Sequence, residues 1–530
     1  MGVGVSPSGG VVSEFPWWKD AVVYQVYPLA FADGNGDGVG DLYGLLDRLD
    51  YLAWLGVDAV WICPIYPSPL ADGGYDVSDH TAVHPLFGDL TVFDRLVDET
   101  HRRGLRLLMD WVPNHTSVEH PWFVESRSSR DNPRRDWYFW RDGTEDSPPN
   151  NWRGFRGRPA WTCDERTGQM YLHLFLPEQP DLNWNNPQVV EAMHATLRFW
   201  LDRGVDGFRI DVIHCIGKHP DLPDEPAALA DVDQVSIHDH DGTHALIRGF
   251  RRILDSYPGD RMMVGEVTLR QTSAIRRYYG QGDELHLAFN FLSLDAGWDA
   301  TEWRELLDHV PMELGAAAWP TWVLTNHDTA RHRTRFGGSE DRARAAAVLL
   351  CTLRGTPFLF QGSELGLLDA PVPADRRIDS YGREGSRAPI PWDGTDGHGW
   401  TGNPPALPFP PGADHRNVAA QIADTGSILH LHRRLLRARH DSPALRRGEW
   451  LPLLTPPGVL GYQRVHDPTG PDHDRRVVLV NFADSASTMT VEGDWRVEVC
   501  SRNSAEGRRF DGGLGPNHAV LLAPVAPANR

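Results

Sequence analysis

The feature that most constrains the fold is a set of short apolar runs that end abruptly in polar residues. Four of them read LRLLMDWVPNH (105–115), GVDGFRID (204–211), RMMVGEV (261–267) and WVLTNHD (322–328). Strands of a parallel barrel are buried on both faces, so their sequences are almost wholly apolar. Residues at the carboxyl ends of such strands face the mouth of the barrel. The pattern therefore predicts parallel strands whose tips carry polar groups.

The number and spacing of these runs favour one architecture. A closed barrel requires eight parallel strands, each followed by a helix. The sequence therefore predicts an α/β fold, a (β/α)8 TIM barrel. The expected strands span 22–27, 59–62, 105–109, 207–210, 262–265, 287–290, 322–324 and 357–360.

A chain of 530 residues is too long for one ordinary core, and two further regions are expected beside the barrel. Residues 115–187, after the third strand, are rich in Trp, Arg, Asn and Pro and lack helical periodicity, which predicts an inserted domain. The barrel then occupies 1–114 and 188–440, with a long Pro- and Gly-rich loop at 366–417 after the eighth strand. Alternating runs at 475–482 and 494–500 predict a C-terminal antiparallel β-sandwich over 441–530.

Three carboxylates stand at the predicted strand tips. Asp211, Glu266 and Asp328 each follow an apolar run. Retaining glycoside cleavage uses one carboxylate as nucleophile and another, about 5 to 5.5 Å away, as alternating acid and base. A single acid at a strand end is more often a helix cap or half of a surface ion pair. Several acids at strand tips of one chain favour a catalytic set.

These motifs resemble those of the α-amylase family of glycoside hydrolases, from about Trp17 to the C-terminus. The likeness is strongest to its oligosaccharide branch of α-glucosidases and oligo-1,6-glucosidases, for which QPDLNW (179–184) is also typical. It implies that Asp211 is the nucleophile, Glu266 the acid/base and Asp328 a stabiliser of the transition state. The insertion resembles the family's domain B, which covers the pocket.

The resemblance also implies a pocket for one terminal glucose. Tyr75, in the motif GGYD, matches a stacking platform, and Asp72 just before it matches the acid that reaches the far hydroxyls. His115 and His327 resemble the paired histidines that hydrogen-bond the sugar.

Two arginines complete this expected pocket. Arg209 lies two residues before Asp211 and is expected to hold that carboxylate ionised by its positive charge. Arg387, in REGSRAPIPWDG (383–394), matches the branch's pocket arginine. With Asp72, Arg387 would pin the non-reducing end of the sugar, so the expected enzyme is an exo-acting, retaining α-glucosidase that cleaves small oligosaccharides or α-glucosides and can also transfer glucose to another sugar.

Other functions within the family remain open. The same motifs serve transglucosidases and isomerases such as trehalose synthase, while transporter-associated members keep the barrel but lose the catalytic acids and carry a membrane span. In this branch a valine at position 212 accompanies α-1,6 preference, but the following HCIGK (214–218) differs from the sequences that are common in the branch. Linkage preference, natural substrate, acceptor and oligomeric state are therefore not predicted.

The segment DGNGDGVGD (33–41) places oxygen-bearing side chains at alternate positions around a glycine-rich turn. This is the pattern of a loop that binds a hard cation, although Gly44 replaces the bidentate glutamate of a complete EF-hand. The resemblance implies a structural Ca²⁺ or Mg²⁺; a turn held by its own hydrogen bonds is the alternative. No organic cofactor is expected. The metal ligands would be Asp33, Asn35, Asp37, Asp41 and the carbonyl of Val39.

The composition limits the classes of molecule that the protein is expected to bind. A net charge of −20 argues against nucleic acid and anionic membranes and favours neutral substrates. No apolar run approaches the roughly 18 residues of a membrane helix, and residues 1–15 lack the features of a secretory signal. The five cysteines are scattered and without metal-ligand spacing, which indicates reduced thiols. A cytoplasmic enzyme acting on small sugars is the expectation.

Overall fold

The computed structural model describes residues 15–226, 239–269, 271–315, 318–377, 379–470 and 473–525. Eight parallel strands form one sheet in the order β10-β11-β1-β2-β3-β7-β8-β9, which confirms the predicted barrel. The strand β3 runs two residues further than expected and so includes Asp110. The barrel strands are β1 (Val23–Val26), β2 (Ala59–Ile62), β3 (Arg106–Trp111), β7 (Gly207–Ile210), β8 (Met262–Gly265), β9 (Leu287–Ala288), β10 (Thr321–Val323) and β11 (Thr356–Phe360).

The strands β9 and β10 stand at the two ends of this order. A side chain spans the gap between them, since the Thr321 hydroxyl donates to the Ala288 carbonyl at 2.9 Å and accepts from the Asn290 amide at 3.2 Å. This hydroxyl joins the two end strands across the gap.

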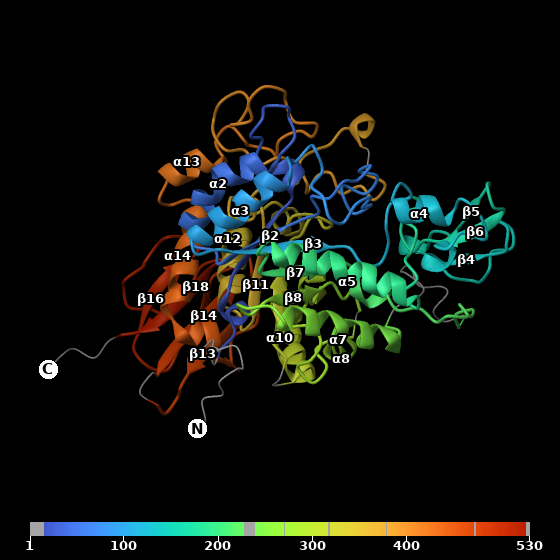
Figure 1. Ribbon diagram of the computed structural model, residues 1–530. Helices are drawn as coiled ribbons and strands as arrows, with labels where there is room; N and C mark the ends of the chain where they lie inside the picture. The colour runs from blue at the N-terminus through green and yellow to red at the C-terminus, as the bar shows by residue number, and fades with distance from the viewer. Residues whose placement is uncertain are drawn as a thin grey trace.

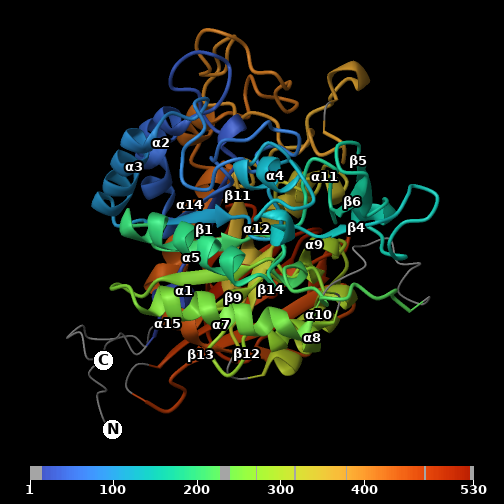
Figure 2. The ribbon, with the colours of Figure 1, turned by 45° about the vertical axis from the view of Figure 1, so that its right-hand side comes forward.

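Helices surround the barrel (Figures 1 and 2). Apolar residues recur on one face of each; in α7, for example, Ile247, Phe250 and Leu254 are buried. In the described part of the chain, no helix is both long and apolar enough to cross a membrane. The barrel helices are α2 (Leu42–Leu55), α3 (Leu90–Arg102), α5 (Pro187–Asp202), α7 (Asp241–Asp255), α8 (Thr272–Arg277), α10 (Ala300–Leu314), α12 (Glu340–Thr352) and α14 (Ile428–Asp441).

Shorter helices lie in the connections. They are α1 (Trp17–Asp20), α4 (Pro121–Ser126), α9 (Leu292–Asp295), α11 (His332–Arg335), α13 (Val418–Ala423) and α15 (Pro443–Arg447), with 3-10 turns η1 (Pro28–Ala30), η2 (Arg135–Trp137), η3 (Phe155–Gly157), η4 (Ile213–Cys215) and η5 (Ala374–Arg376).

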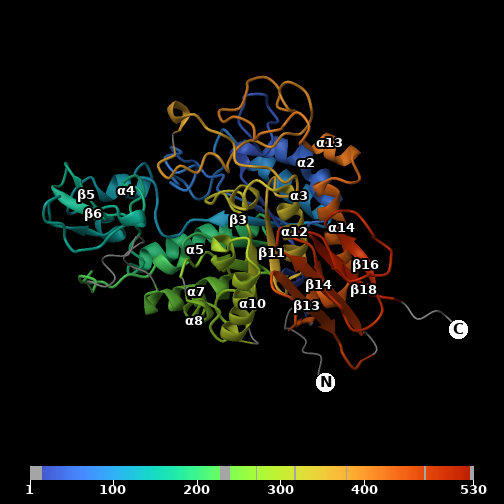
Figure 3. The same ribbon diagram turned by 180° about the vertical axis from the view of Figure 1, so that it is seen from behind.

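The insertion after β3 forms a small unit of its own. It contains α4 and a three-stranded antiparallel sheet in the order β4-β6-β5. In Figures 1 and 3 this unit lies at one side of the barrel, opposite the C-terminal strands. Its strands are β4 (Trp140–Arg141), β5 (Trp161–Asp164) and β6 (Gln169–Leu172).

The C-terminal region is antiparallel, as predicted. A five-stranded sheet has the order β12-β13-β14-β18-β16, and β15 pairs with β17. Buried Arg464 of β13 ties this sheet to the barrel, because its guanidinium donates to the Thr352 carbonyl of α12 at 2.7 Å and to the Gly448 carbonyl at 2.9 Å. The strands are β12 (Glu449–Pro452), β13 (Val459–His466), β14 (Asp474–Asn481), β15 (Ser487–Thr488), β16 (Trp495–Cys500), β17 (Gly513–Leu514) and β18 (Ala519–Pro524).

The long loop after β11 packs over the loop that follows β1, and both lie at the top of Figure 1. The Trp392 indole donates to the Phe31 carbonyl at 2.8 Å, and the Asn403 amide donates to the Gly36 carbonyl at 3.0 Å. The first and last strands of the barrel therefore carry loops that support each other.

A glycine in β7 provides a test of the barrel packing. A Cβ at position 207 would overlap the Met262 carbonyl oxygen of β8. Gly207→Ala must therefore push two paired strands apart, and we expect it to lower the free energy of unfolding by about 1–3 kcal/mol, measured as a lower melting temperature. Gly249→Ala is the control, because its Cβ in α7 meets His194 only at 3.4 Å and alanine favours the helix. Equal melting temperatures for the two variants would contradict this packing.

Candidate active site

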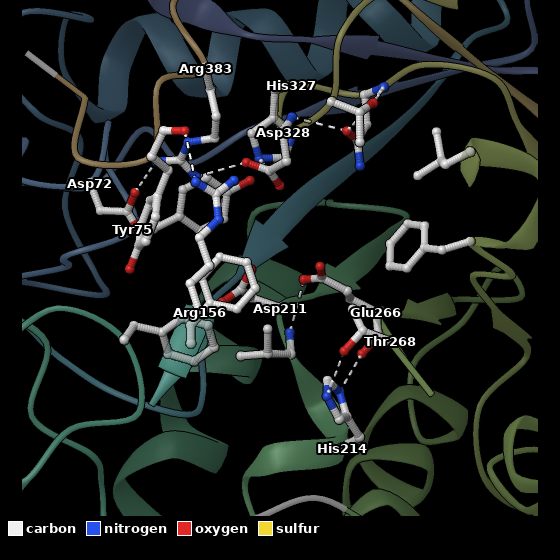
Figure 4. A pocket seen from close by; sticks show the side chains of 18 of the residues that line it. Asp72, Tyr75, Arg156, Asp211, His214, Glu266, Thr268, His327, Asp328 and Arg383 are labelled. Carbon is white, nitrogen blue, oxygen red and sulfur yellow. Dashed lines mark hydrogen bonds and ion pairs between the residues drawn. The ribbon is translucent and has the colours of Figure 1, made fainter. Parts of the chain in front are cut away.

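A cavity of about 410 Å³ opens at the carboxyl ends of the barrel strands. Figure 4 shows Asp211 and Glu266 in its centre, Asp72, Asp328 and Arg383 on one side, and His214 and Thr268 on the opposite side. The barrel thus brings together residues that are far apart in sequence. Of the residues expected from sequence, those that line the cavity are Asp72, Tyr75, His115, Asp211, Glu266, His327 and Asp328.

The buried guanidinium of Arg209 holds three carboxyl groups. Its Nη1 donates to Asp110 Oδ1 at 2.8 Å and to Asp211 Oδ1 at 2.6 Å, and its Nη2 donates to Glu266 Oε2 at 2.5 Å. The strand register explains this convergence, because Arg209 pairs with Asp110 of β3 on one side and with Val264 of β8 on the other. One positive charge is therefore shared among acids from three adjacent strands.

The surroundings of Asp211 raise its pKa. Burial raises the pKa of Asp211 well above its usual value, and repulsion from Glu266 and Asp110 adds to the effect, so that Arg209 does not offset it. Burial likewise raises the pKa of Asp110 to about 6. Arg209 lowers the pKa of Asp211, as expected, but burial raises it by more, and the two neighbouring acids add to that rise. Asp110 and Asp211 therefore have higher pKa values than free carboxyls.

The backbone after β7 is strained beside these acids. Val212 has φ 35° and ψ 43°, a left-handed conformation that is rare for a β-branched residue. Its N–H donates to Glu266 Oε2 at 3.1 Å. The strain therefore directs a backbone amide at Glu266.

The charges around Asp328 outweigh its burial and lower its pKa, in contrast to those around Asp211. Arg383 Nη1 donates to its Oδ1 at 2.8 Å and Arg387 Nη2 at 3.0 Å. Burial would raise the pKa of Asp328, but His327, Arg383 and Arg387 together lower it well below its usual range. Asp328 is therefore held ionised, whereas burial raises the pKa of Asp110 and of Asp211.

His327 is fixed on both ring nitrogens. Gln25 Nε2 lies 2.7 Å from Nδ1, and Asp328 Oδ2 lies 3.3 Å from Nε2. The Tyr75 ring stacks on the imidazole with centroids 5.2 Å apart and planes 5° apart. Burial lowers the pKa of His327 well below its usual value, so the ring is neutral.

The pocket arginine is Arg383 rather than Arg387. Arg383 lines the cavity and pairs with Asp72, Asp328 and Asp379. Arg387 is buried, and its Nε donates to the His327 carbonyl at 2.8 Å, so it supports Asp328 without being among the cavity-lining residues. Both arginines belong to the REGSR stretch, so that motif carried the signal for Arg383.

Asp110 was also missed by the sequence reasoning. It stands inside the first strand-tip motif, LRLLMDWVPNH, as an acid within an apolar run. The Trp61 indole and the Tyr75 hydroxyl donate to its Oδ2 at 3.1 and 2.9 Å. The sequence did contain a signal for Asp110. A buried strand would normally have an apolar residue at this position, and here it has an acid.

One end of the cavity is bounded by contacts between the insertion and the long loop after β11. Arg156 Nη1 donates to the Tyr381 carbonyl at 3.0 Å, and the Phe155 and Tyr381 rings meet edge to face at 5.3 Å. Beneath them Asp72 pairs with Arg383 and accepts from Gln179 Nε2 at 3.0 Å. These contacts close the side of the cavity that Asp72 occupies.

Lys218 fixes the insertion to the segment after β7. Its buried Nζ donates to Asn114 Oδ1 at 2.9 Å and to the Cys215 carbonyl at 2.8 Å, and lies 2.8 Å from Asp181 Oδ2. It thus joins the start of the insertion, its QPDLN end and the turn after Asp211. Cys215 itself is buried in an apolar cluster, and burial raises its thiol pKa well above the usual value, so it is inert.

The loop 33–41 carries the oxygen-bearing side chains expected of a cation site. Asp33, Asn35 and Asp37 accept hydrogen bonds from backbone amides of the loop itself. Asp41 Oδ2, however, is buried without a hydrogen-bond partner, and burial together with the charges of Asp33 and Asp37 raises the pKa of Asp41. An oxygen-only set with a buried, unpartnered carboxylate oxygen fits a hard cation.

The fold and the cavity define a class, that of (β/α)8 enzymes with a carboxylate site at the barrel mouth. The sequence model of the alpha amylase catalytic domain matches residues 25–448. An oligo-1,6-glucosidase of Parageobacillus thermoglucosidasius is 37% identical over 88% of this chain and 91% of its own, and a probable alpha-glucosidase of Rhizobium meliloti is 40% identical over 89% and 90%. The chain belongs to the α-amylase family of glycoside hydrolases.

Solved structures agree in fold. An alpha-glucosyl transfer enzyme superposes with a TM-score of 0.88 at 37% identity, covering 97% of this chain and 100% of that one. The trehalulose synthase of Pseudomonas mesoacidophila superposes with a TM-score of 0.88 at 34% identity, covering 96% and 100%.

The raised pKa of Asp110 predicts a pH-dependent loss of stability. Its pKa is about 6 in the fold, against about 3.9 in an unfolded chain. Between these values the folded chain keeps a proton that the unfolded chain has released, so the free energy of unfolding falls as pH rises, and the loss is complete above about pH 6. Asp110→Asn removes this loss, roughly 3 kcal/mol.

We therefore expect the melting temperature of Asp110→Asn, relative to the wild type, to rise between about pH 4 and pH 6 and to level off above that range. The exposed Asp131→Asn carries the same chemical change and should show no such trend. A difference for Asp110→Asn that stays flat or falls with pH would contradict the shared-guanidinium account.

Proposed function

We propose that the protein is an exo-acting, retaining α-glucosidase that removes terminal α-linked glucose from small oligosaccharides or α-glucosides. The observation that carries this proposal is that Asp211 and Glu266 both line one cavity and both bind the Arg209 guanidinium. A shared guanidinium holds the two carboxyls close together, and retaining enzymes need a separation of about 5 to 5.5 Å.

In the first step Asp211 attacks the anomeric carbon while Glu266 protonates the leaving oxygen, giving a β-glucosyl-enzyme. Of the acids around one guanidinium, one must be charged and another protonated for this step. Arg209 lies against both carboxyls, and its positive charge stabilises the carboxylate form of Asp211 that the attack requires.

In the second step Glu266, now a carboxylate, takes a proton from water or from a sugar hydroxyl that attacks the anomeric carbon. The C1–O bond to Asp211 breaks and the product keeps the α configuration. Attack by water gives hydrolysis, and attack by a sugar gives transglucosylation.

The remaining pocket residues are proposed to bind the glucose unit. Asp328, held ionised by its arginines, would contact hydroxyls beside the reacting carbon, with His115 and His327 as further partners. Tyr75 supplies an aromatic face. The ion pair of Asp72 with Arg383 lies at one end of the cavity, where it would limit the room beyond the terminal sugar, which supports exo-action.

Transfer or isomerisation by the same residues is the second candidate. It is supported by the likeness in fold to an alpha-glucosyl transfer enzyme and to a trehalulose synthase. Such activities differ from hydrolysis in the nucleophile that reaches the glucosyl-enzyme, so the products decide between them.

The test is a product analysis. The purified protein is incubated separately with maltose, isomaltose, sucrose, trehalose and kojibiose, and the products are followed by chromatography. We expect free glucose from at least one α-linked disaccharide. New oligosaccharides or isomers with little free glucose would instead establish the second candidate.

Catalytic variants accompany this test. Asp211→Asn and Glu266→Gln should each lower kcat by roughly a thousandfold or more while the melting temperature shows a folded protein. The exposed Asp131→Asn and Glu165→Gln are matched controls that should keep wild-type kcat. Wild-type turnover in either catalytic variant would refute the assigned roles.

A structural Ca²⁺ or Mg²⁺ is proposed at the loop 33–41. When bound, the cation would neutralise this acidic turn and hold it against the long loop after β11. In the described part of the chain no three His, Cys, Asp or Glu side chains are already grouped to hold a metal, so the three aspartates of the loop would have to turn toward the cation, with the Asn35 amide and the Val39 carbonyl as the other ligands. The proposed ligands are Asp33, Asn35, Asp37, Val39 and Asp41.

Chelation tests this site. A ligand bound only by the folded state stabilises it, so treatment with EDTA should remove one equivalent of metal and lower the melting temperature, and added Ca²⁺ or Mg²⁺ should restore it. The Asp37→Ser variant should bind less metal, whereas Asp131→Asn should not. Unchanged metal content and melting temperature after chelation would favour the self-bonded turn.

A further inference from the structure

The cavity has two chemically different halves. Charged and hydrogen-bonding groups line the half formed by Asp72, His115, Asp328 and Arg383. The other half, beyond Glu266, is built from segments that follow β7, β8, β9 and β10 and combines a group of apolar side chains with polar ones. We define this apolar wall as Val212, Leu269, Phe291, Leu292 and Leu294.

The strand register places the apolar wall beside the reacting groups. In the sheet β7 pairs with β8 through Ile210 and Gly265, and β8 pairs with β9 through Gly265 and Ala288. The segments after these strands therefore start next to Glu266. Leu269, Phe291 and Leu292 are half-buried, so their side chains are within reach of a bound molecule.

Polar groups in this half are largely committed to one another. His214 Nε2 lies 2.8 Å from the Thr268 hydroxyl, and His214 Nδ1 lies 3.2 Å from the Glu266 carbonyl. Asn326 Oδ1 accepts from the Asp328 amide at 2.9 Å and from the Thr329 hydroxyl at 3.0 Å. Asp295 is exposed at the rim.

A second sugar is poorly matched to such a wall. Each hydroxyl that loses water without gaining a partner costs about 1–3 kcal/mol, and a pyranose ring brings several. An aryl or cycloalkyl group has no such requirement, and contact with leucine and phenylalanine side chains removes its apolar surface from water. The net charge of −20 and the exposed Asp295 also disfavour an anionic group.

The geometry points to a neutral alcohol with an aryl or cycloalkyl group as the preferred glucosyl acceptor at this wall. The inference rests on the proposed glucosidase activity and names the class of molecule that occupies the acceptor half. The same half would hold the aglycone of an aryl or alkyl α-glucoside during cleavage.

The transfer step balances without another reactant. The oxygen of the alcohol attacks C1 of the glucosyl-enzyme, the C1–O bond to Asp211 breaks, and the Asp211 carboxylate is restored. The hydroxyl proton passes to Glu266, which gave up a proton when the donor was cleaved. The product is an α-glucoside of the apolar alcohol.

The experiment measures how the glucosyl-enzyme partitions between acceptors. α-Glucosyl fluoride serves as donor, because its small leaving group does not fill the acceptor half. Fluoride release counts every turnover, and free glucose counts hydrolysis, so their difference gives transfer. Benzyl alcohol and cyclohexylmethanol are compared with methyl β-glucoside, which presents a primary alcohol on a similar ring that carries hydroxyls.

At equal concentration we expect transfer to benzyl alcohol and cyclohexylmethanol to exceed transfer to methyl β-glucoside by roughly tenfold. Leu292→Asn should lower the ratio of transfer to hydrolysis for the two apolar alcohols by about fivefold and leave that for methyl β-glucoside equal or higher. Phe291→Ser tests the same wall independently. The control Leu454→Asn changes a leucine that is 98% exposed, far from any role in the cavity, and should keep wild-type ratios.

The outcomes separate the two proposals. Fluoride release with transfer to methyl β-glucoside equal to or above that to the apolar alcohols overturns this inference and leaves the glucosidase proposal standing. Equal ratios in wild type, Leu292→Asn and Phe291→Ser overturn the role of the wall. Absence of fluoride release and of glucose release from every α-glucoside would overturn the proposed function and this inference with it.

Discussion

The Arg209 guanidinium is the interaction on which the rest of the site depends. It stands at the tip of β7, between acids that arrive from β3 and β8; its Nη1 binds Asp110 and Asp211, and its Nη2 binds Glu266. A buried guanidinium without its acids, or the acids without it, would leave charge unpaired in an apolar barrel. The strand register that brings Arg209 and the acids together and the charge balance at the barrel mouth therefore depend on each other.

Sequence reasoning located the barrel well, because buried parallel strands are apolar on both faces and polar tips mark their ends. All eight strands lie where the apolar runs predicted them. It was weaker where function depends on proximity in space. Arg383 was missed because the loop after β11 has no periodicity to orient it. The rise in the pKa of Asp211 was missed because its burial and its two acidic neighbours cannot be read from the local sequence.

The cavity walls come from separate parts of the chain. The insertion and the loop after β11 meet at Arg156 and Tyr381, while Lys218 fixes the insertion to the turn that follows Asp211. The half that holds the acids is thus braced by ion pairs, and the half formed after β8 and β9 by apolar packing. Barrels that share one set of catalytic acids can therefore bind different acceptor molecules if only the second half of the cavity changes.

The pairing of Asp72 with Arg383 joins positions 311 residues apart, and β1 pairs with β11 through Val23 and Phe358. As the chain leaves the ribosome, the part of the protein that precedes β11 therefore carries an open sheet edge and acids that lack their counter-charge. The edge can close once β11 has emerged, and Asp72 gains its counter-charge only when the segment around residue 383 has followed. Assembly of the catalytic mouth is thus a late event of synthesis, set by chain connectivity.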